Sequence, residues 1–544
     1  MSLSKRSSFL IPTLIAIPFI ARLILVWQDF ERLVKSSPLL EDDFFYCLNI
    51  ARNVVVGNGF SADGETPTTG FQWLHELLCV GITALSGSES DLPFRILLTL
   101  QVLISFVGVW LLRRLLLQVS AEMEANVAAI MFAWWLPLLR YGNNGLETVL
   151  AIVLLLWFLN EVMAFCNGTS HRGTPFLGFL AGACVLARID LVAAGVAGFA
   201  VMLFHFIKTQ ERRSAFATAM LWVGAGTAGG LGVVMAANMT INGHPIPDSG
   251  VAVQELAKLY AEQFGYSVGI IPALTRASGA LLADHPFAQL LGAMGMGGWM
   301  GNTVVLVALI AATVWLFRNQ IRTQRLTSLF VFALVIGVLL IGLYTLVAPA
   351  YWFMGRYLFP ISVLLLVLSI FPLTNVLRRI LAWNKFVGGI IPAILLLFYG
   401  NAFFERWSGF MFDPIEHVSD DMLTSGVIEE TPVCHNYDIA RWIALNSTPD
   451  TRIAMWQGGL VSYMVQPFIL HLDGVVNRSG LESWKSGRVH EYLVSQRIES
   501  FVDFESVAQL ALGRSGAEAS GIIKLGTTRC AEGTRVVVYS ITEQ

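Results

Sequence analysis

The chain has 544 residues, of which 55% are hydrophobic and only 13% are charged, and its mean hydropathy is +0.64. A soluble domain carries about 25% charged residues to cover its surface. The composition therefore excludes an ordinary soluble protein and indicates long apolar segments that are solvated by lipid. The net charge of −3 also excludes a strongly basic chain of the kind that binds nucleic acid.

The first apolar run covers residues 9–27 and follows Lys5 and Arg6. A signal peptide would end at a small-residue cleavage site, but this run continues into Trp27 and Gln28, so we interpret it as a retained first span. Length and hydropathy predict about eleven spans in all. The others cover residues 94–112, 125–139, 146–164, 175–188, 190–207, 215–237, 302–317, 328–348, 358–376 and 386–402.

Basic residues predict the orientation of the chain, because Lys and Arg concentrate in cytoplasmic loops. If the N-terminus is cytoplasmic and the short apolar run 73–85 does not cross, the basic clusters all flank loops on one side. Counting 73–85 as a span would put the later clusters outside, so we predict a juxtamembrane helix there. The clusters are Lys5/Arg6, Arg113/Arg114, Arg172, Lys208/Arg212/Arg213, Arg318/Arg322/Arg325 and Arg378/Arg379/Lys385.

This topology leaves three larger pieces on the extracytoplasmic side: a first loop of 28–93, a second loop of 238–301, and the tail. The tail predicts a small α/β module, with a helix over 438–446 and strands at 452–456, 468–472, 501–503 and 535–541. The predicted fold class is an α-helical polytopic membrane protein, with a transmembrane domain over 1–402 and a C-terminal soluble α/β domain over 403–544. Cys434 and Cys530 both lie in the tail, and a disulfide between them is one possibility there.

The first loop carries an acidic pair, Asp42 and Asp43, at the start of a predicted helix. Apolar residues at 44, 48, 51 and 55 share one face of this helix, and Gly57 is suited to end it. Acids at a helix N-terminus commonly cap it, which is one interpretation of the pair. The other rests on position, because an acid at the membrane surface can have a raised pKa and act as a base.

Seven further short motifs follow the acidic pair along the chain: Gly57-Asn58-Gly59-Phe60, Thr69-Gly70-Phe71-Gln72, Gly145-Leu146-Glu147-Thr148, Ala187-Arg188-Ile189-Asp190, Pro245-Ile246-Pro247-Asp248-Ser249-Gly250, Gly355-Arg356-Tyr357-Leu358-Phe359-Pro360 and Asp473-Gly474-Val475-Val476-Asn477. In this order they make the chain resemble the GT-C superfamily of membrane glycosyltransferases, which use polyprenyl-phosphate sugars. Protein mannosyltransferases, aminoarabinose transferases and arabinofuranosyltransferases are of this type. The superfamily carries an acidic pair in its first extracytoplasmic loop.

The resemblance implies transfer of a sugar from a polyprenyl-phosphate donor to an extracytoplasmic acceptor hydroxyl by direct, inverting displacement. A glycosidase needs two carboxylates, because an alkoxide leaving group must be protonated. A phosphate leaves as a stable anion, so one base and a cation that holds the phosphate suffice. By its match to the first acid of the family pair, Asp42 is predicted to be the general base. Asp43 would orient the acceptor or the base, and the assignment between the two is open.

The cation that would hold the phosphate is predicted to be Arg356, which lies at the outer headgroup level and can make two parallel hydrogen bonds. The alternative is snorkelling to ordinary headgroups. Tyr357 joins this phosphate site or belongs to an aromatic belt. Arg188 and Asp190 either bind phosphate and substrate or form a structural ion pair with each other.

The remaining predicted contacts lie on the same side of the membrane. Glu147 either contacts the acceptor or caps the helix that it precedes. His244 is a candidate substrate contact or a plain surface residue, and Lys258 is predicted to meet phosphate together with Arg276. His471 and Asp473 in the tail are predicted to be structural.

The sequence has no convincing spacing of metal ligands and no nucleotide-binding motif, so neither a metal nor a cofactor is predicted. The predicted partners are a polyprenyl-phosphate sugar, membrane lipids and a glycan, lipid or protein acceptor, and the predicted location is the bacterial inner membrane.

Three other interpretations of the sequence remain. A transporter or flippase of lipid-linked sugars would show paired halves with broken helices. The others are a ligase for lipid-linked oligosaccharide and a receptor that uses the tail for binding.

Overall fold

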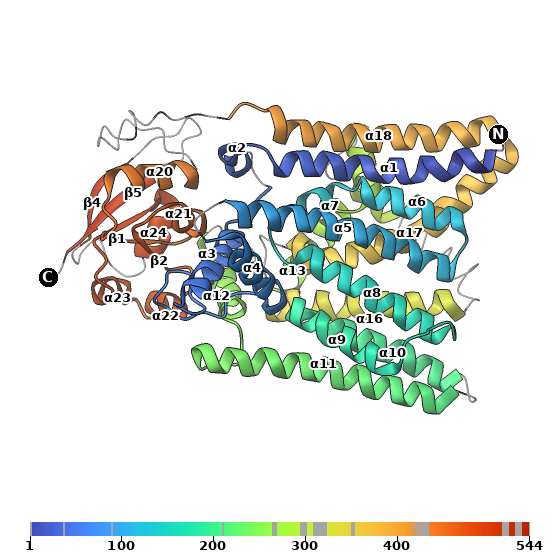
Figure 1. The fold of residues 1–544 in the computed structure, drawn as a ribbon, viewed down its shortest axis with the longest axis horizontal. Helices are drawn as coiled ribbons and strands as arrows, with labels where there is room; N and C mark the ends of the chain where they lie inside the picture. Colours follow the sequence, from blue (N-terminus) through green and yellow to red (C-terminus); the bar gives the residue numbers. More distant parts are fainter. Residues whose placement is uncertain are drawn as a thin grey trace.

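The computed structural model describes residues 3–542, apart from 36–38, 89–90, 209–211, 264–268, 294–301, 308–323, 350–353, most of 416–434, 514–521 and 528–535. The described chain has two parts, a long bundle of helices and a small domain with a β-sheet at one end of it (Figure 1). Cys434 and Cys530 lie outside the described residues, so the possible disulfide is not assessed by the structure.

Among the described residues, six helices are long and apolar enough to cross a membrane, and four apolar helices are shorter. The long ones are α5 (Leu92–Val119), α8 (Thr148–Cys166), η1 with α10 (Ile189–Leu191 and Val192–Lys208), α11 (Arg213–Asn242), α16 with the π-helical turn η3 (Gln324–Gly342 and Leu343–Val347) and α17 (Met354–Trp383). The shorter ones are the apolar part of α1 (Leu3–Val26), α4 (Trp73–Ser86), α9 (Thr174–Ala187) and α13 (Ile270–Ala283).

Most of the predicted spans are therefore helices, and three places need comment. The predicted span 302–317 lies mostly outside the described residues. The predicted span 125–139 is two helices, α6 (Glu122–Ala133) and α7 (Leu136–Tyr141), because Pro137 in the first turn of α7 favours a fresh helix start. The last predicted span is α18 (Lys385–Phe412), which runs beside α1 (Figure 1).

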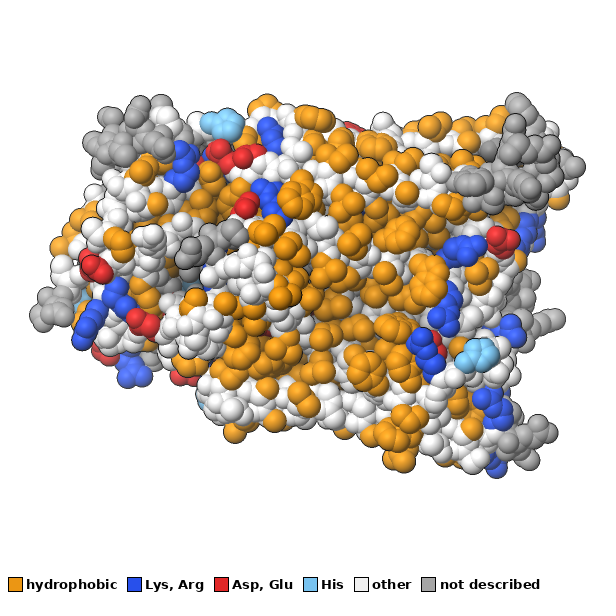
Figure 2. Space-filling model, in the orientation of Figure 1, with side chains coloured by type: hydrophobic (Ala, Val, Ile, Leu, Met, Phe, Trp, Pro, Cys, Tyr) orange, Lys and Arg blue, Asp and Glu red, His pale blue; other side chains and the backbone are white. Residues whose placement is uncertain are grey.

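The helices of the first loop and the first helix of the second loop lie where the bundle meets the small domain (Figure 1). They are α2 (Phe30–Lys35), α3 (Asp42–Val56), α4 and α12 (Asp248–Gln263). The other two helices of the second loop pack against the bundle: α13 contacts α17, and α14 (Pro286–Ala293) contacts α18. The helix α4 lies next to α3 at this end of the bundle, which fits the predicted juxtamembrane helix better than a crossing one. Hydrophobic side chains cover the middle of the bundle, and Lys and Arg gather at the end that is far from the small domain (Figure 2).

Two helices of the bundle approach each other through glycines at four-residue spacing. Gly178 and Gly182 on α9 face Gly226 and Gly230 on α11. A Cβ atom at position 226 would lie 1.9 Å from the carbonyl oxygen of Gly178, so only hydrogen fits at this crossing. Small residues at such spacing let helix backbones pack closely in membranes, where hydrophobic burial does not drive association.

Gly226→Ala is therefore expected to lower the free energy of unfolding by about 1–3 kcal/mol, because the methyl group forces the two helices apart. The control is Gly224→Ala on the same helix, where an added Cβ meets nothing within 4 Å. That change raises helix propensity by about 1 kcal/mol without a clash. Thermal unfolding in detergent separates the two, and equal stability of both variants would show that the crossing is looser than described.

The small domain is a five-stranded sheet of order β2-β1-β3-β5-β4 with helices around it. Strands β1 (Arg452–Met455), β2 (Phe468–His471) and β3 (Ser500–Phe504) are parallel, whereas β5 (Val536–Ile541) runs antiparallel to β3 and to β4 (Ile522–Thr527). All four predicted strands are confirmed, and β4 is the one that the sequence pattern did not indicate. The helices are α20 (Asn436–Asn446), α21 (Gly459–Met464), α22 (Arg478–Lys485), α23 (Val489–Ser495) and α24 (Glu505–Gly513).

The loops that follow the carboxyl ends of the parallel strands contact the first loop of the chain. The loop after β2 brings Asp473 to the hydroxyl of Tyr46 on α3, with an Oη–Oδ2 distance of 3.4 Å. Ion pairs also join the first loop to α20, at Lys35–Asp438, 2.7 Å, and to the first residue of β1, at Glu65–Arg452, 2.8 Å. The carboxyl edge of parallel strands is where α/β proteins place their functional loops, and here that edge faces the bundle.

Candidate active site

The acidic pair lies in the first turn of α3, which begins at Asp42 and ends at Gly57 with a φ of 94°. Glu41 stands at the N-cap, and its side chain makes no capping hydrogen bond within the described chain. The predicted helix and its glycine terminator are both confirmed. On its apolar face Phe44 and Leu48 are buried, while Val55 is 37% exposed.

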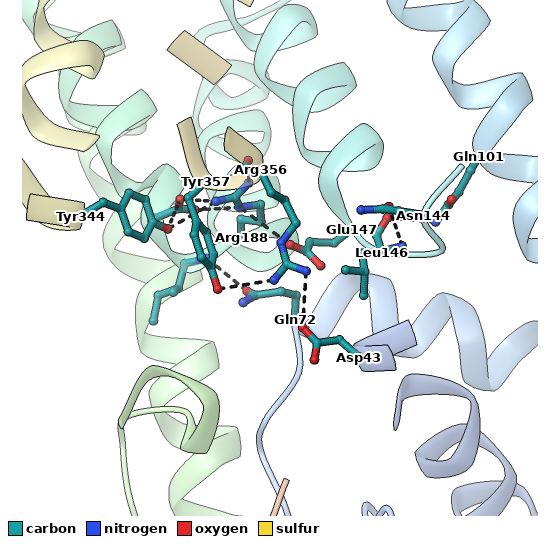
Figure 3. Close-up of polar contacts among 12 residues, drawn as sticks. Asp43, Gln72, Gln101, Asn144, Leu146, Glu147, Arg188, Tyr344, Arg356 and Tyr357 are labelled. Carbon is teal, nitrogen blue, oxygen red and sulfur yellow. Dashed lines mark hydrogen bonds and ion pairs between the residues drawn. The ribbon is translucent and has the colours of Figure 1, made fainter. Parts of the chain in front are cut away.

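The two acids of the pair point to different places. An oxygen of Asp43 lies 3.4 Å from Nη1 of Arg356, which lies in the first turn of α17 (Figure 3). The carboxylate of Asp42 instead accepts hydrogen bonds from the backbone N–H groups of Gly459 and Leu460, each at 2.9 Å. Asp43 lines a cavity and Asp42 does not.

The cavity encloses about 90 Å³ where the first loop, the bundle and the C-terminal domain meet. It collects charged and aromatic side chains from six separate segments of sequence. The lining residues are Asp43, Tyr46, Cys47, Gly70, Phe71, Gln72, Leu146, Glu147, Arg188, Ile189, Asp190, Ser249, Val253, Leu256, Tyr344, Arg356, Tyr357, Gln457 and Val475.

Two guanidinium groups lie in this cavity with different partners. Arg356 is 7% exposed and donates from Nη2 to the hydroxyl of Tyr357 at 3.4 Å. Arg188 makes a two-pronged ion pair with Asp190, with distances of 3.1 and 2.6 Å. The hydroxyl of Tyr344 donates to the same carboxylate at 2.6 Å. The predicted ion pair of Arg188 and Asp190 is thus observed, and both residues also face the cavity.

Two tyrosine rings lie beside the guanidinium groups of Arg356 and Arg188. The ring of Tyr357 stacks on that of Tyr344, with centroids 4.6 Å apart. The guanidinium carbon of Arg356 lies 5.1 Å from the Tyr357 ring centre and that of Arg188 lies 5.5 Å from it. An aromatic ring attracts cations, so Tyr357 stabilises both guanidinium charges.

Glu147 is the third acid of the cavity and stands just before α8. Its carboxylate lies 3.9 Å from Nε of Arg188, and it is 6% exposed. It makes no side-chain capping bond to the helix that it precedes, as far as the described residues go. Its side chain is therefore directed to the cavity (Figure 3).

Burial sets the protonation of the acidic pair. Burial raises the pKa of Asp43, against the opposing effect of the Arg356 charge. Burial raises the pKa of Asp42 to about 6, although the N–H groups of Leu460 and Gly459 favour its charged form. The pKa of Asp43 is thus set by burial and the Glu147 charge, which raise it, and by Arg356, which lowers it.

Besides Asp42, two of the predicted site residues do not line this cavity. His244 is exposed in the turn after α11. Lys258 is on α12 with its side chain 66% exposed, and it pairs with Glu255 at 3.0 Å. The helix α12 reaches the cavity instead through Ser249, Val253 and Leu256, near its N-terminal end.

The C-terminal domain contributes Gln457 and Val475 to the cavity, which sequence reasoning did not anticipate. Gln457 follows β1 and Val475 follows β2, so both stand at the carboxyl edge of the parallel strands. A Cβ atom at Gly70 would lie 1.8 Å from the carbonyl oxygen of Val475, so glycine is needed for this loop to come so close. The sequence signal that could have indicated these two residues is their position at the end of a predicted strand, next to a glycine-containing loop.

Within the described residues, no group of three or more His, Cys, Asp or Glu side chains has a geometry that holds a metal ion. The prediction of a metal-independent site remains a prediction.

The chain was compared with protein families, with curated proteins and with solved structures. No protein-family model matches the chain, and no curated protein does. Among solved structures, an oligosaccharyltransferase from Archaeoglobus fulgidus tethered with an acceptor peptide is 13% identical, with a TM-score of 0.54, covering 98% of this chain and 74% of that one. The same organism's oligosaccharyltransferase AglB in complex with an inhibitory peptide and a dolichol-phosphate is 13% identical, with a TM-score of 0.50, covering 100% and 75%.

ArnT from Cupriavidus metallidurans bound to undecaprenyl phosphate is 13% identical, with a TM-score of 0.51, covering 97% of this chain and 98% of that one. At such identities the likeness shows the fold alone. The chain is a multi-pass integral membrane protein with the fold of the GT-C glycosyltransferases, across nearly its whole length. The resemblance predicted from the motifs is thereby confirmed at the level of fold.

Proposed function

We propose that this protein is a membrane glycosyltransferase that moves a sugar from a polyprenyl-phosphate donor to an acceptor hydroxyl. The observation that carries the proposal is the meeting of Asp43 and Arg356 at 3.4 Å in a cavity of a GT-C fold. These two groups are the base and the phosphate-binding cation that displacement of a lipid phosphate requires. The ArnT and AglB structures, which hold undecaprenyl phosphate and dolichol-phosphate, support a donor of this kind.

The donor phosphate binds the guanidinium of Arg356 in this proposal, with Tyr357 and Arg188 beside it. A guanidinium offers two parallel N–H groups that match two phosphate oxygens. Arg356 is paired with Asp43 before the donor arrives. The incoming phosphate pairs with Arg356 in place of Asp43. The phosphate thereby neutralises the positive charge that lowers the pKa of Asp43. Donor binding thereby makes Asp43 a stronger base.

The reaction is a single displacement. The acceptor oxygen attacks the anomeric carbon from the face opposite the phosphate, and the bond from that carbon to the phosphate oxygen breaks. The acceptor proton passes to Asp43, and the polyprenyl phosphate leaves as an anion held by Arg356. The sugar configuration inverts. Glu147 and Asp190, which face the same cavity, orient the acceptor hydroxyl and the sugar hydroxyls.

We place the cavity and the C-terminal domain on the extracytoplasmic side of a bacterial inner membrane, with the N-terminus in the cytoplasm. The support is the gathering of Lys and Arg at the end of the bundle far from that domain (Figure 2). Such an excess of basic residues marks cytoplasmic ends.

A transport assay separates the proposed enzyme from a flippase, which is the second candidate. The purified protein is placed in liposomes that contain a polyprenyl-phosphate sugar, and a panel of glycan, lipid and peptide acceptors is supplied. A glycosyltransferase releases free polyprenyl phosphate in a one-to-one ratio with glycosylated acceptor. A flippase moves the intact lipid to the other leaflet and consumes none of it, and that outcome would end the proposal.

The pH dependence of transfer follows from the raised pKa of Asp43. A general base must be deprotonated, so kcat/KM is expected to fall as the pH drops through the pKa of Asp43 in the free enzyme. Because burial raises that pKa, the fall begins above the ordinary aspartate value of about 3.9. A profile that is flat down to that value, or that rises on acidification, would contradict the assignment of Asp43 as base.

A further inference from the structure

One side of α3 forms hydrogen bonds with the C-terminal domain at each successive turn. The residues on that side recur every three or four positions, which places them in one row along a helix. Nδ2 of Asn49 donates to the carbonyl oxygen of Gly459 at 3.0 Å. Nη1 of Arg52 donates to the carbonyl oxygen of Tyr463 at 2.7 Å, and its guanidinium lies 3.7 Å from the Tyr463 ring centre. The row is Asp42, Tyr46, Asn49 and Arg52.

The first of these contacts leaves no space for a side chain at position 459. Asp42 receives two N–H groups from the start of α21, both at 2.9 Å. A Cβ atom at Gly459 would lie 2.5 Å from the backbone oxygen of Asp42 and 2.9 Å from its Oδ2. The two backbones are therefore in direct contact, with no room for a side chain between them.

Asp43 is the next residue and lies on the cavity side of the same turn. Consecutive residues on an α-helix are about 100° apart, so the rotation of α3 that seats Asp42 on the domain also fixes the direction of Asp43. A rotation of α3 or a shift along its axis would carry the Asp43 carboxylate away from Arg356 and from the acceptor.

We propose that Asp42 is a positioning residue: its contact with Gly459 and Leu460 makes the C-terminal domain the part that sets the direction of the Asp43 carboxylate. This inference rests on the proposed function, because it assigns Asp43 the chemical role and Asp42 the mechanical one. A displacement of about 1 Å at a reacting group costs about 10²-fold in rate. Loss of the Asp42 contact is therefore expected to lower kcat strongly.

The neighbouring glycine supplies a matched control. A Cβ atom at Gly458 would meet Sδ of Met455 at 3.1 Å and a methyl group of Ile469 at 3.2 Å, both inside the C-terminal domain. Gly458→Ala and Gly459→Ala thus add the same methyl group one residue apart. The first presses on the domain interior and the second presses on α3, and neither changes a charge.

The test compares these two variants in the sugar-transfer assay and in hydrogen exchange of the α3 amides. Gly459→Ala is expected to lower kcat by about 10–100-fold. It leaves the KM for the donor within about twofold of the wild type, because the phosphate-binding Arg356 comes from another element. Gly458→Ala keeps kcat close to that of the wild type. Hydrogen exchange in the first two turns of α3 becomes faster in Gly459→Ala and stays unchanged in Gly458→Ala.

A conservative change at Asp42 provides the rescue arm. Asp42→Asn keeps one oxygen that can accept an N–H group, whereas Asp42→Ala keeps none, so the asparagine variant is expected to retain more kcat than the alanine variant. If Asp42→Asn is as inactive as Asp43→Asn while Gly459→Ala is active, Asp42 is the chemical base and the inference fails. It also fails if Gly459→Ala raises only the KM, or if exchange in α3 does not respond to it. Absence of any transfer by the wild type would instead refute the proposed function, and hydrogen exchange still decides the contact.

Discussion

Asp43→Asn is expected to lower kcat for sugar transfer by about 10²–10⁴-fold, the usual contribution of a positioned general base. The amide has nearly the shape of the carboxylate but cannot take the acceptor proton. Because Arg356 keeps its position in α17 and loses a competing anion, binding of polyprenyl phosphate is expected to be equal to or tighter than in the wild type. Single-turnover transfer and binding of the labelled lipid measure the two effects separately.

The control for this variant is Asp42→Asn, the same chemical change one residue earlier. Asp42 is occupied by the N–H groups of Gly459 and Leu460. Its substitution is therefore expected to cost less turnover than that of Asp43. Asp43→Asn with transfer near that of the wild type would remove Asp43 from the chemistry.

Substitution of Arg356 is expected to weaken donor binding. Hydrogen bonds to charged groups contribute about 1.5–3 kcal/mol each, so the loss of two such bonds to phosphate raises the KM for the donor by about 10²–10⁴-fold. Arg356→Lys keeps the positive charge beside Asp43 but loses the paired geometry, and is expected to fall between the wild type and Arg356→Ala. Titration of the rate with donor concentration measures these effects.

Arg406→Ala is the matched control for Arg356. Arg406 lies near the end of α18, is exposed, and is not among the residues that line the cavity. Its loss is expected to leave the donor KM unchanged. Equal effects at the two arginines would show that the donor senses only the general positive charge of the headgroup region.

Much of the fold could be predicted because its signals are local. Apolar length predicted most of the bundle helices, and the residue pattern of the tail predicted four strands of the sheet. The helix of the acidic pair and its end at Gly57 followed from periodicity and from the glycine. Arg356 was predicted to lie near the acidic pair because the predicted topology puts both on the outer side of the membrane, and Arg356 and Asp43 line the same cavity.

The features that sequence reasoning missed depend on contacts between distant segments. Which of the two acids faces the cavity is decided by Gly459, which is more than four hundred residues from the pair. The contribution of Gln457 depends on how the C-terminal domain sits on the bundle. The exposed position of Lys258 depends on the rotation of α12, which turns Ser249 and Val253 to the cavity instead.

A structure of the Asp43→Asn variant with the intact polyprenyl-phosphate sugar tests the central claim most directly. The account predicts the phosphate within hydrogen-bond distance of the Arg356 guanidinium, and the anomeric carbon turned toward the side chain at position 43. A phosphate held elsewhere in the bundle, with position 43 facing away from the sugar, would contradict it.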